Sequence, residues 1–264
     1  MSPQGPSPET APLAGRSIVV TRPLEQSESL CGAIRAAGGE ALLFPVIAIG
    51  PAPDDADLRA IAGRLEEFDI AFFVSPNAVR YALDSVLARR AWPAALRVAT
   101  VGKGSERELA RYGFDAVIAP QDGFDSESVI ALPEFASAAV AGRRVVIFRG
   151  DGGRDLLADT LRQRGALVEF VTSYRRFRPE LDSSPLVERA RAGGLDALLL
   201  TSSEGVDNLV AMAGPAGMAV LQSVPVFAPH ARIAARAREA GFRRVFATGA
   251  GDAGMLQALL SHFG

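Results

Sequence analysis

The chain has 264 residues, a length that suits one large domain or two ordinary ones and allows sizeable hydrophobic cores. Its composition is 48% hydrophobic and 22% charged, close to the globular average, which argues against general disorder. The formal net charge of −2 excludes a strong bulk attraction to nucleic acid, so we expect no nucleic-acid partner. A polyanionic ligand would have to be recognised by local donors.

The cysteine content and the N-terminal segment indicate where the protein works. The single cysteine, Cys31, excludes an internal disulfide and fits a reducing compartment; it follows Leu30 in a helical pattern, so we expect a packed apolar residue. Residues 1–14 hold four prolines and no apolar core, which predicts a flexible tail and not a signal peptide. No apolar run is long enough to span a membrane. We therefore expect a soluble, cytoplasmic protein without a membrane partner.

In chain order, short aliphatic runs alternate with amphipathic helical stretches, a pattern typical of βα units and a mainly parallel sheet. The strands predicted in the first half cover residues 17–21, 69–74, 97–101 and 115–119, and helices are expected after the first three. The second half repeats this order with strands at residues 144–148, 196–201, 224–228 and 243–247. The seven residues from Asp69, DIAFFVS, correspond to the seven from Asp196, DALLLTS.

Each first unit ends in an unusual apolar stretch closed by proline, at residues 41–50 and 167–178. Both are too long and too apolar for ordinary loops and too closely flanked by proline for helices. We expect two extended strands that run side by side between two lobes.

Candidate ligand-binding residues follow the predicted strands, because ligands of open α/β sheets bind beyond the carboxyl ends of the strands. The positions concerned are Arg22, Ser75, the residues from Gly102 to Ser105, those from Arg149 to Arg154, Ser202 and Ser203, and those from Pro229 to Ala231. Small, hydroxylic and glycyl residues leave helix-start N–H groups able to bind carboxylate or phosphate. For any single position, a plain helix cap explains the residue as well. Their recurrence in both halves favours anion binding for the set.

Several catalytic and cofactor motifs are absent. Gly102 and Gly104 lack the third glycine of a dinucleotide fingerprint, where Arg107 stands, and there is neither a Walker lysine motif nor a Gly-x-Ser-x-Gly elbow. With His230, His262 and one cysteine, we expect no metal site. Two classes remain: an enzyme that shapes a substrate held between its lobes, and a non-catalytic carrier or sensor of a small anion. A nucleotide-dependent enzyme is the weaker third.

Taken in order, these motifs resemble the uroporphyrinogen-III synthase family, over a span from about Gly15 to the C-terminus. In the first half the matching segments are Val20-Thr21-Arg22-Pro23, Phe44-Pro45-x-Ile47-x-Ile49, Phe73-Val74-Ser75-Pro76-Asn77-Ala78-Val79, Val101-Gly102-x-Gly104-Ser105 and Ser126-Glu127-Ser128. In the second half they are Arg149-Gly150-x-Gly152-Gly153-Arg154-x-x-Leu157, Arg164-Gly165-Ala166-x-Val168, Tyr174-Arg175-Arg176-x-x-Pro179 and Leu200-Thr201-Ser202-Ser203. One departure is the turn around His230, where many relatives carry a Gly-x-x-Thr-Ala sequence, so the hydroxyl contact expected there is lost or replaced by His230.

The resemblance implies an α/β fold of two Rossmann- or flavodoxin-like lobes with mainly parallel sheets, joined by a two-stranded antiparallel linker. Carried over to this chain, lobe one is 15–44 plus 180–264, lobe two is 51–170, the linker strands are 45–50 and 171–179, and 1–14 is the flexible tail. Periodicity alone does not favour this exchange over two consecutive lobes.

The resemblance also implies a reaction. The substrate would be hydroxymethylbilane, a linear tetrapyrrole with eight carboxylates, which loses its hydroxyl as water to give an azafulvene. Attack by the last pyrrole gives a spiro intermediate, and fragmentation and recombination invert that pyrrole (ring D) to yield uroporphyrinogen III in haem biosynthesis. We expect a cofactor-independent hydro-lyase that is monomeric and receives its substrate by transient hand-off from hydroxymethylbilane synthase.

The residue that the resemblance points to for proton donation is Tyr174, although packing at the hinge would explain this tyrosine equally well. A phenol is a weak acid, so its role would not be indispensable. The candidate substrate-binding residues are Arg22, Ser75, Pro76, Asn77, Gly102, Lys103, Gly104, Ser105, Ser126, Arg149, Gly150, Arg154, Ser202, Ser203 and His230. Arg149 and Arg154 could equally pair with the nearby Asp151 and Asp155.

Overall fold

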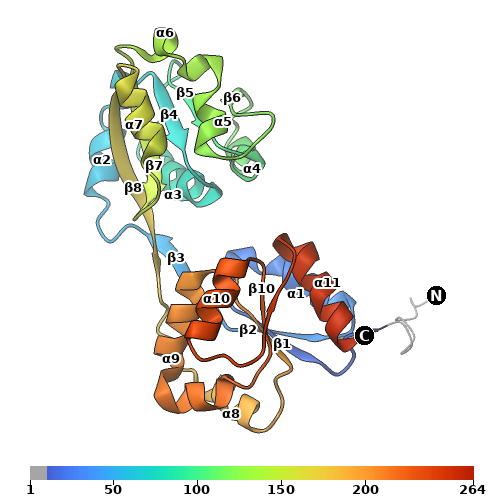
Figure 1. Cartoon of the computed structure of the whole chain (residues 1–264). Coiled ribbons are helices and arrows are strands. Elements are labelled where there is room, and N and C mark those ends of the chain that lie inside the picture. The colour runs from blue at the N-terminus through green and yellow to red at the C-terminus, as the bar shows by residue number, and fades with distance from the viewer. Residues whose placement is uncertain (1–10) are drawn as a thin grey trace, which may run out of the picture. The chain divides into compact units, whose positions relative to one another are not determined.

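The computed structural model describes residues 11–264 and divides them into two lobes (Figure 1). Lobe one holds the described residues up to Ala48 together with Phe177–Gly264, and lobe two is Ile49–Arg176. The chain thus passes from one lobe to the other after Ala48 and returns after Arg176. Both points lie inside the ranges expected for the linker strands, 45–50 and 171–179.

Lobe one is built on a five-stranded sheet in the order β11-β10-β9-β1-β2, in which every pair is parallel. The strands are β1 (Ser17–Val20), β2 (Glu40–Leu43), β9 (Ala197–Leu199), β10 (Val226–Ala228) and β11 (Val245–Ala247). The helical segments are η2 (Leu24–Gln26), α1 (Glu28–Ala36), α8 (Ser184–Arg191), α9 (Ser203–Leu221), α10 (Ala231–Glu239) and α11 (Gly251–Phe263).

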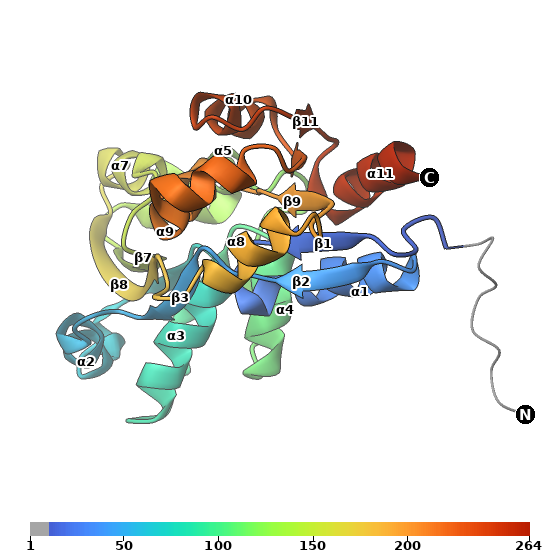
Figure 2. The same ribbon diagram turned by 90° about the horizontal axis from the view of Figure 1, so that it is seen from below.

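Two apolar layers cover this sheet, because successive side chains of a strand point to opposite faces. Val19 packs with residues of α8, α9 and α10, whereas Ile18 and Val20 pack with residues of α1 and α11 (Figure 2). Cys31 lies in the second layer with 4% of its surface exposed, as expected, and burial raises the pKa of its thiol.

Lobe two is built on a six-stranded sheet in the order β3-β8-β7-β4-β5-β6. The strands are β3 (Ala48–Pro51), β4 (Ile70–Phe73), β5 (Arg97–Thr100), β6 (Val117–Ile118), β7 (Arg144–Gly150) and β8 (Leu167–Phe177). The helical segments are α2 (Ala56–Ala62), η3 (Leu65–Glu67), α3 (Pro76–Leu87), α4 (Lys103–Arg111), α5 (Ser126–Ile130), η4 (Pro133–Phe135), α6 (Ser137–Val140) and α7 (Leu156–Gln163). The pairs from β8 to β6 are parallel, and the edge strand β3 makes the sheet a mixed one.

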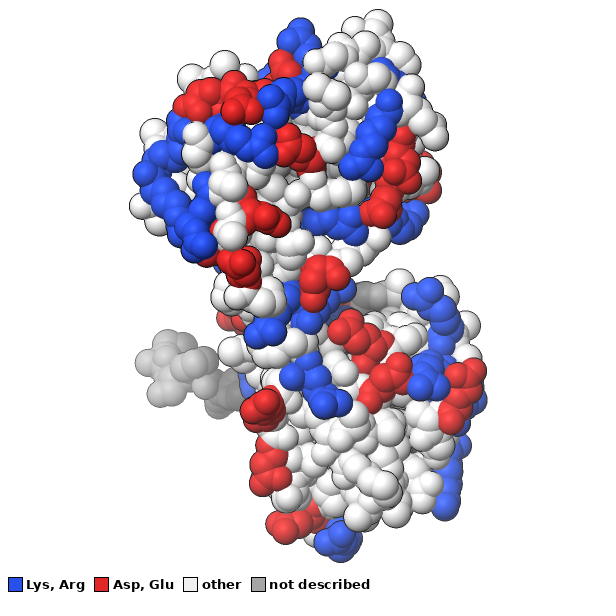
Figure 3. Space-filling view, turned by 90° about the vertical axis from the view of Figure 1, so that its left-hand side faces the viewer, with Lys and Arg blue, Asp and Glu red and all other residues white. Residues whose placement is uncertain are grey.

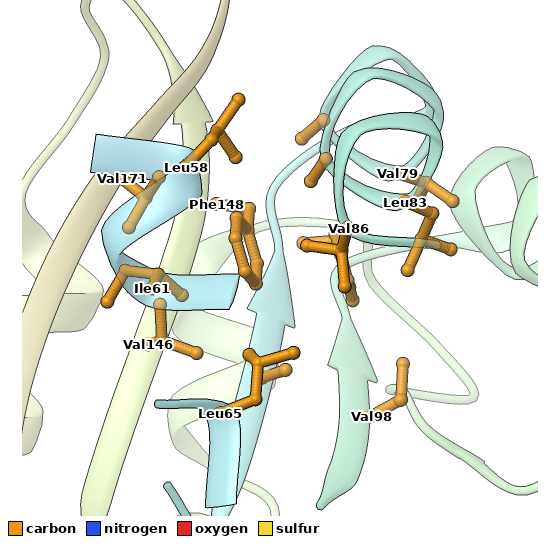
Figure 4. Close-up of a cluster of buried hydrophobic side chains, with 14 of the residues drawn as sticks. Leu58, Ile61, Leu65, Val79, Leu83, Val86, Val98, Val146, Phe148 and Val171 are labelled. Atoms are coloured by element: carbon orange, nitrogen blue, oxygen red, sulfur yellow. The ribbon is translucent and has the colours of Figure 1, made fainter. Parts of the chain in front are cut away.

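The two faces of the lobe-two sheet carry separate cores. Phe148 and Val146 of β7 pack with Leu58 and Ile61 of α2 and with α3 (Figure 4). The alternate residue Ile147 packs on the other face with residues of α5 and α7. The helix-covered α/β fold with mainly parallel sheets agrees with the expected fold class.

The predicted internal repeat is confirmed by the strand order, since β11-β10-β9-β1-β2 matches β6-β5-β4-β7-β8. The aspartates that begin the repeated segments also act alike. Asp69 accepts a hydrogen bond from the backbone N of Arg144 at 2.8 Å, and Asp196 accepts one from the backbone N of Ser17 at 2.8 Å. Each carboxylate therefore ties the start of its own strand to the start of the neighbouring strand.

The stretch at residues 41–50 was expected to be one extended strand, and this expectation is wrong. It contains two short strands: β2 joins the lobe-one sheet beside β1, and only β3 pairs with β8. Pro45 lies between them, and a proline has no N–H to continue a ladder. The second stretch forms one strand, β8, that ends at Phe177.

The expected flexible tail covered residues 1–14, of which residues 1–10 lie outside the described part. Leu13 is fully buried in the α1 and α11 layer, and its backbone N donates to the carbonyl of Ala37 at 3.0 Å. The ordered part of lobe one therefore starts before Gly15. Among the described helices, none has the length and apolar character needed to cross a membrane.

Charged side chains of both signs are interspersed on the face shown in Figure 3. Many form ion pairs; in lobe two, Glu169 contacts Arg64 at 2.5 Å and Arg144 at 3.1 Å. That face therefore presents no extended basic surface of the kind that binds nucleic acid.

Candidate active site

The candidate site residues of lobe two gather at the carboxyl ends of its strands, in two groups on opposite faces of the sheet. Ser75, Tyr81, Gly150 and Tyr174 form the first group, which we call the phenol cluster. The second group lines a cavity around Arg149, which we call the arginine cavity.

The phenol cluster joins a helix start to a buried tyrosine. Ser75 is the N-cap of α3, and its Oγ accepts a hydrogen bond from the backbone N of Ala78 at 3.1 Å. The same hydroxyl donates to Oη of Tyr174 at 3.2 Å, so it does more than cap the helix. The Tyr174 ring stacks on that of Tyr81 with centroids 6.1 Å apart. Only 4% of the surface of Tyr174 is exposed, so packing and hydrogen bonding both hold this phenol in place.

Gly150 fits this cluster because it lacks a side chain. A methyl group at this position would lie 2.8 Å from Cζ of Tyr174 and 3.1 Å from its hydroxyl oxygen. Contacts below 3.0 Å are not seen for real Cβ atoms, so the tyrosine would have to move. Glycine at the end of β7 is therefore required for the observed position of the phenol.

A β-bulge decides which face Tyr174 occupies. Arg149 is paired with Thr172 and Gly150 with Tyr174, which leaves Ser173 as an extra residue in β8. The buried Ser173 hydroxyl donates to the carbonyl of Arg149 at 3.1 Å, a hydrogen bond that links the two strands at the bulge. Strict alternation would put Tyr174 on the side of Phe170, but the bulge places it with Val171, beneath α3.

The arginine cavity has a volume of about 260 Å³. Its apolar lining comes from both strands and helices: Phe72, Val74, Val101, Phe124, Ile147, Leu157, Ala158 and Phe170. Its remaining lining residues are polar, charged or glycine: Asp125, Ser126, Arg149, Gly152, Gly153 and Arg154. An apolar pocket with a few polar groups is the usual form of a small-molecule site.

Arg149 is the most enclosed cation of this cavity, with 14% of its side chain exposed. Its guanidinium lies 4.6 Å from the centroid of the Phe170 ring and donates to Asp155 at 2.5 Å. Of the two pairings left open by the sequence, the one with Asp155 is therefore correct for Arg149. Arg154 pairs instead with Glu127, at 3.4 Å, because its side chain projects toward the start of α5 and is 65% exposed.

Several other expected residues lie at the neighbouring helix starts. Pro76 and Asn77 begin α3, Gly102 is the N-cap of α4, and Ser126 begins α5 and lines the cavity. A methyl on Gly104 would lie 3.3 Å from Cγ of Pro76, so the starts of α3 and α4 are in contact. Two residues are less suited to binding: Lys103 pairs with Glu106 at 3.0 Å, and Ser105 is 3% exposed.

The expected residues of lobe one bond within their own lobe. Arg22 forms an ion pair with Asp252 of α11. Ser202 caps α9 by accepting from the backbone N of Gly205 at 2.9 Å, and Ser203 is the first residue of that helix. The exposed His230 caps α10, with its Nδ1 accepting from the backbone N of Arg232 at 3.1 Å. Helix capping thus accounts for Ser202 and His230 in this structure.

Sequence reasoning missed several residues of the site, among them Tyr81, Phe124 and Phe170. An exposed aromatic residue next to a capping aspartate, as at Phe124-Asp125, is a weak signal that could have drawn attention to the loop before α5. The other two give no local signal because they sit in regular elements. Within residues 11–264 no group of three or more His, Cys, Asp or Glu side chains could hold a metal ion.

Comparison with known proteins supports the family resemblance that the sequence motifs indicate. The family model described as uroporphyrinogen-III synthase HemD matches residues 28–257. The uroporphyrinogen-III synthase of Salmonella typhimurium is 36% identical over 196 residues, which cover 73% of this chain and 78% of the relative. That of Escherichia coli is 33% identical over 194 residues, with the same shares, 73% and 78%.

Solved structures support the fold. A mutant uroporphyrinogen III synthase from Thermus thermophilus superposes with a TM-score of 0.55 at 20% identity, covering 94% of this chain and 99% of that one. The uroporphyrinogen-III synthetase of Helicobacter pylori gives a TM-score of 0.58 at 14% identity, with the same coverage, 94% and 99%. The chain therefore belongs to the uroporphyrinogen-III synthase family of lyases, which catalyses the cyclisation of hydroxymethylbilane in tetrapyrrole biosynthesis.

Proposed function

We propose that this chain converts hydroxymethylbilane into uroporphyrinogen III, with inversion of the last pyrrole and without a metal or organic cofactor. The observation that carries the assignment of roles is at the end of β7. There, the adjacent residues Arg149 and Gly150 bring an enclosed guanidinium and a buried phenol to one strand end. On one face of the sheet the guanidinium would hold a carboxylate of the flexible substrate, and on the other face the phenol would donate a proton.

Tyr174 is proposed as the proton donor to the departing hydroxyl. The C–O bond of the terminal hydroxymethyl group breaks, the oxygen takes the phenol proton and leaves as water, and the electron pair of the pyrrole nitrogen forms the N-protonated azafulvene, whose positive charge balances the phenolate. Because the Ser75 hydroxyl donates to Oη of Tyr174, it would stabilise the phenolate that remains after proton transfer. Its weak acidity makes Tyr174 an assisting donor and not an indispensable one.

The larger task of the enzyme is conformational. Closure without the enzyme gives the uninverted isomer, so the protein has to favour the attack that leads through the spiro intermediate. Arg149 is proposed to hold a substrate carboxylate, since a guanidinium binds carboxylate with two parallel hydrogen bonds. Further substrate contacts are proposed at the remaining candidate positions, of which Pro76 has no N–H to donate: Arg22, Ser75, Pro76, Asn77, Gly102, Lys103, Gly104, Ser105, Ser126, Gly150, Arg154, Ser202, Ser203 and His230.

The physiological setting is proposed to be the cytoplasm, with the chain acting as a monomer. Because hydroxymethylbilane closes on its own to the uninverted isomer, a transient hand-off from hydroxymethylbilane synthase would limit that loss. The ratio of the two isomers formed at different ratios of the two enzymes would measure such a hand-off.

The decisive experiment is to incubate the full chain with freshly prepared hydroxymethylbilane and to separate the product isomers by chromatography. We expect the inverted isomer to predominate over the uninverted isomer that forms in a sample without protein. Formation of the uninverted isomer alone, at the rate seen without protein, would refute the proposal.

A further inference from the structure

The arginine cavity is too small for the whole substrate. Pockets that enclose drug-sized ligands measure about 300 to 1,000 Å³, whereas this cavity measures about 260 Å³. A linear tetrapyrrole with eight carboxylates carries two on each of its four rings. The cavity therefore matches one flat ring with one acidic side chain, and the rest of the chain would lie outside it.

Phe124 gives the cavity an aromatic wall. Its ring lies against the start of α4, where a methyl on Gly102 would be 3.3 Å from Cδ1 of the phenylalanine. Even so, 58% of the residue is exposed to solvent, so much of the ring surface is open to contact with a ligand. With Phe72 and Phe170 also in the lining, the cavity has three aromatic side chains around a flat aromatic ligand.

The charge in the cavity is held by an internal carboxylate. Arg149 donates to Asp155, whose side chain is 55% exposed and makes no capping hydrogen bond to α7. Asp155 therefore occupies a place on the guanidinium that a substrate carboxylate could take. An exposed carboxylate is displaced at low cost, because water solvates it after it is released.

We propose that the arginine cavity is a subsite for a single pyrrole ring of the substrate, an inference that rests on the proposed function. Phe124 covers the face of the ring, and Arg149 binds one of its carboxylates after Asp155 is displaced. Phe124 is thus a further binding residue, and Asp155 is an internal competitor of the substrate.

The first test uses a pyrrole dicarboxylic acid as the probe and the full chain as the protein, with binding measured by calorimetry. We expect Phe124→Ala to raise the Kd of the probe about tenfold, a typical loss for a stacked aromatic, and Phe124→Tyr to keep the wild-type value. Leu167→Ala is the matched control, because Leu167 is 61% exposed, lies at the start of β8 and is not among the residues that line the cavity. Equal Kd values for Phe124→Ala and the control would overturn the inference, as would a wild-type chain that does not bind the probe.

The second test asks whether Asp155 competes with the substrate carboxylate for Arg149 or helps Arg149 to bind it. If Asp155 competes with the substrate, Asp155→Asn should lower the Kd of the probe about threefold, although it removes a charged hydrogen bond from the protein. An unchanged or higher Kd would overturn the assignment of Asp155 as a competitor. Thermal unfolding of each variant establishes that it is folded.

The isomer assay distinguishes failure of the subsite from failure of the proposed function. For Phe124→Ala we expect a KM for hydroxymethylbilane raised about tenfold and a kcat within about twofold of wild type. Formation of the inverted isomer with an unchanged KM in this variant would refute the subsite alone. Failure of the wild-type chain to form the inverted isomer would refute the proposed function, whatever the probe does.

Discussion

The two lobes share a strand order but use matched positions differently. Arg22 and Arg149 stand at corresponding positions at the carboxyl ends of equivalent strands, as do Ser202 and Ser75. In lobe two the arginine lines a cavity and the serine bonds a phenol. In lobe one the arginine bonds Asp252, and the serine caps a helix. Arg149 and Ser75 make the corresponding bonds, to Asp155 and to the start of α3, so the cavity and the phenol are what lobe two adds. A repeated scaffold thus fixes where functional groups can stand, whereas the neighbouring segments decide what they do.

The neighbouring segment that matters most is the strand after the first helix of each unit. In lobe one this strand, β2, ends at Leu43. In lobe two its counterpart, β8, continues to Phe177 and contains the bulge that turns Tyr174 toward Ser75. The phenol cluster of lobe two thus depends on the part of β8 that has no counterpart in β2.

The strongest test of this difference is a substitution at the contact between β7 and the phenol. We expect Gly150→Ala to lower kcat at least tenfold and to destabilise the chain by about 1 to 3 kcal/mol, because the added methyl overpacks against Tyr174 and the resulting shift would move the end of β7 that carries Arg149 as well as the phenol. Gly32→Ala in α1 of lobe one is the control, since nothing lies within 4 Å of a methyl at that helical position. It should stabilise the chain by about 0.5 to 1 kcal/mol. Urea unfolding and initial rates would measure both effects.

The matched arginines allow a direct comparison of the lobes. Arg149→Gln should raise the KM for hydroxymethylbilane about tenfold, the loss expected for a hydrogen bond to a charged group. Arg22→Gln should have an effect of about threefold or less, because its partner Asp252 is 31% exposed, against 55% for Asp155, and is therefore harder for a substrate carboxylate to displace. Steady-state kinetics of both variants would decide; equal increases in KM would mean that the two positions bind substrate alike.

The Tyr174 hydroxyl should have a smaller effect on the kinetics than the charge of Arg149. We expect Tyr174→Phe to lower kcat by less than tenfold while the inverted isomer remains the product, since a weak acid assists departure of water without directing the ring. Unchanged turnover would remove Tyr174 from the catalytic residues and leave it with a packing role. Loss of the inverted isomer would show that it steers the ring closure.

The smallest effect should come from the ion pairs that Glu169 of β8 makes with Arg64 and Arg144. Hydrogen bonds from Arg64 and Arg144 lower the pKa of Glu169 against the opposing effect of burial. A carboxyl with a lowered folded-state pKa stabilises the protein above its unfolded pKa, near 4.3, and this contribution is lost as pH falls through the lower folded-state value.

Glu169→Gln should therefore cost about 1 kcal/mol or less at pH 7, because the side chain is 37% exposed and solvent screens the pair. The difference from wild type should vanish at a pH well below 4. Urea unfolding at both pH values measures it. A difference that persists in acid would mean that the glutamate acts through packing and not through charge.

Much of the fold follows from local patterns in the sequence. The βα alternation, the repeat beginning at Asp69 and Asp196, and the capping positions of Ser75 and Ser202 all depend on residues close in the chain. The same holds for the burial of Cys31, which its helical pattern predicted. Local chemistry was therefore enough to find the edges of the sheets where the candidate residues lie.

The parts that could not be predicted depend on contacts over long distances. Simple alternation along β8 puts Tyr174 on the wrong face, because the extra residue Ser173 is defined only by its pairing with β7. The partner of Arg154 depends on how α5 and α7 pack, and that of Arg22 on a helix near the C-terminus. Sequence spacing contains none of this information.

The discontinuity of lobe one has a consequence for how the chain folds during synthesis. All strands of lobe two are complete once Phe177 has emerged from the ribosome, so lobe two can fold while the remaining residues are being translated. Strand β1 must wait for its neighbour β9, and the bond between Ser17 and Asp196 closes a separation of 179 residues. The apolar first strands of lobe one are thus the segment of a nascent chain that most needs protection by chaperones.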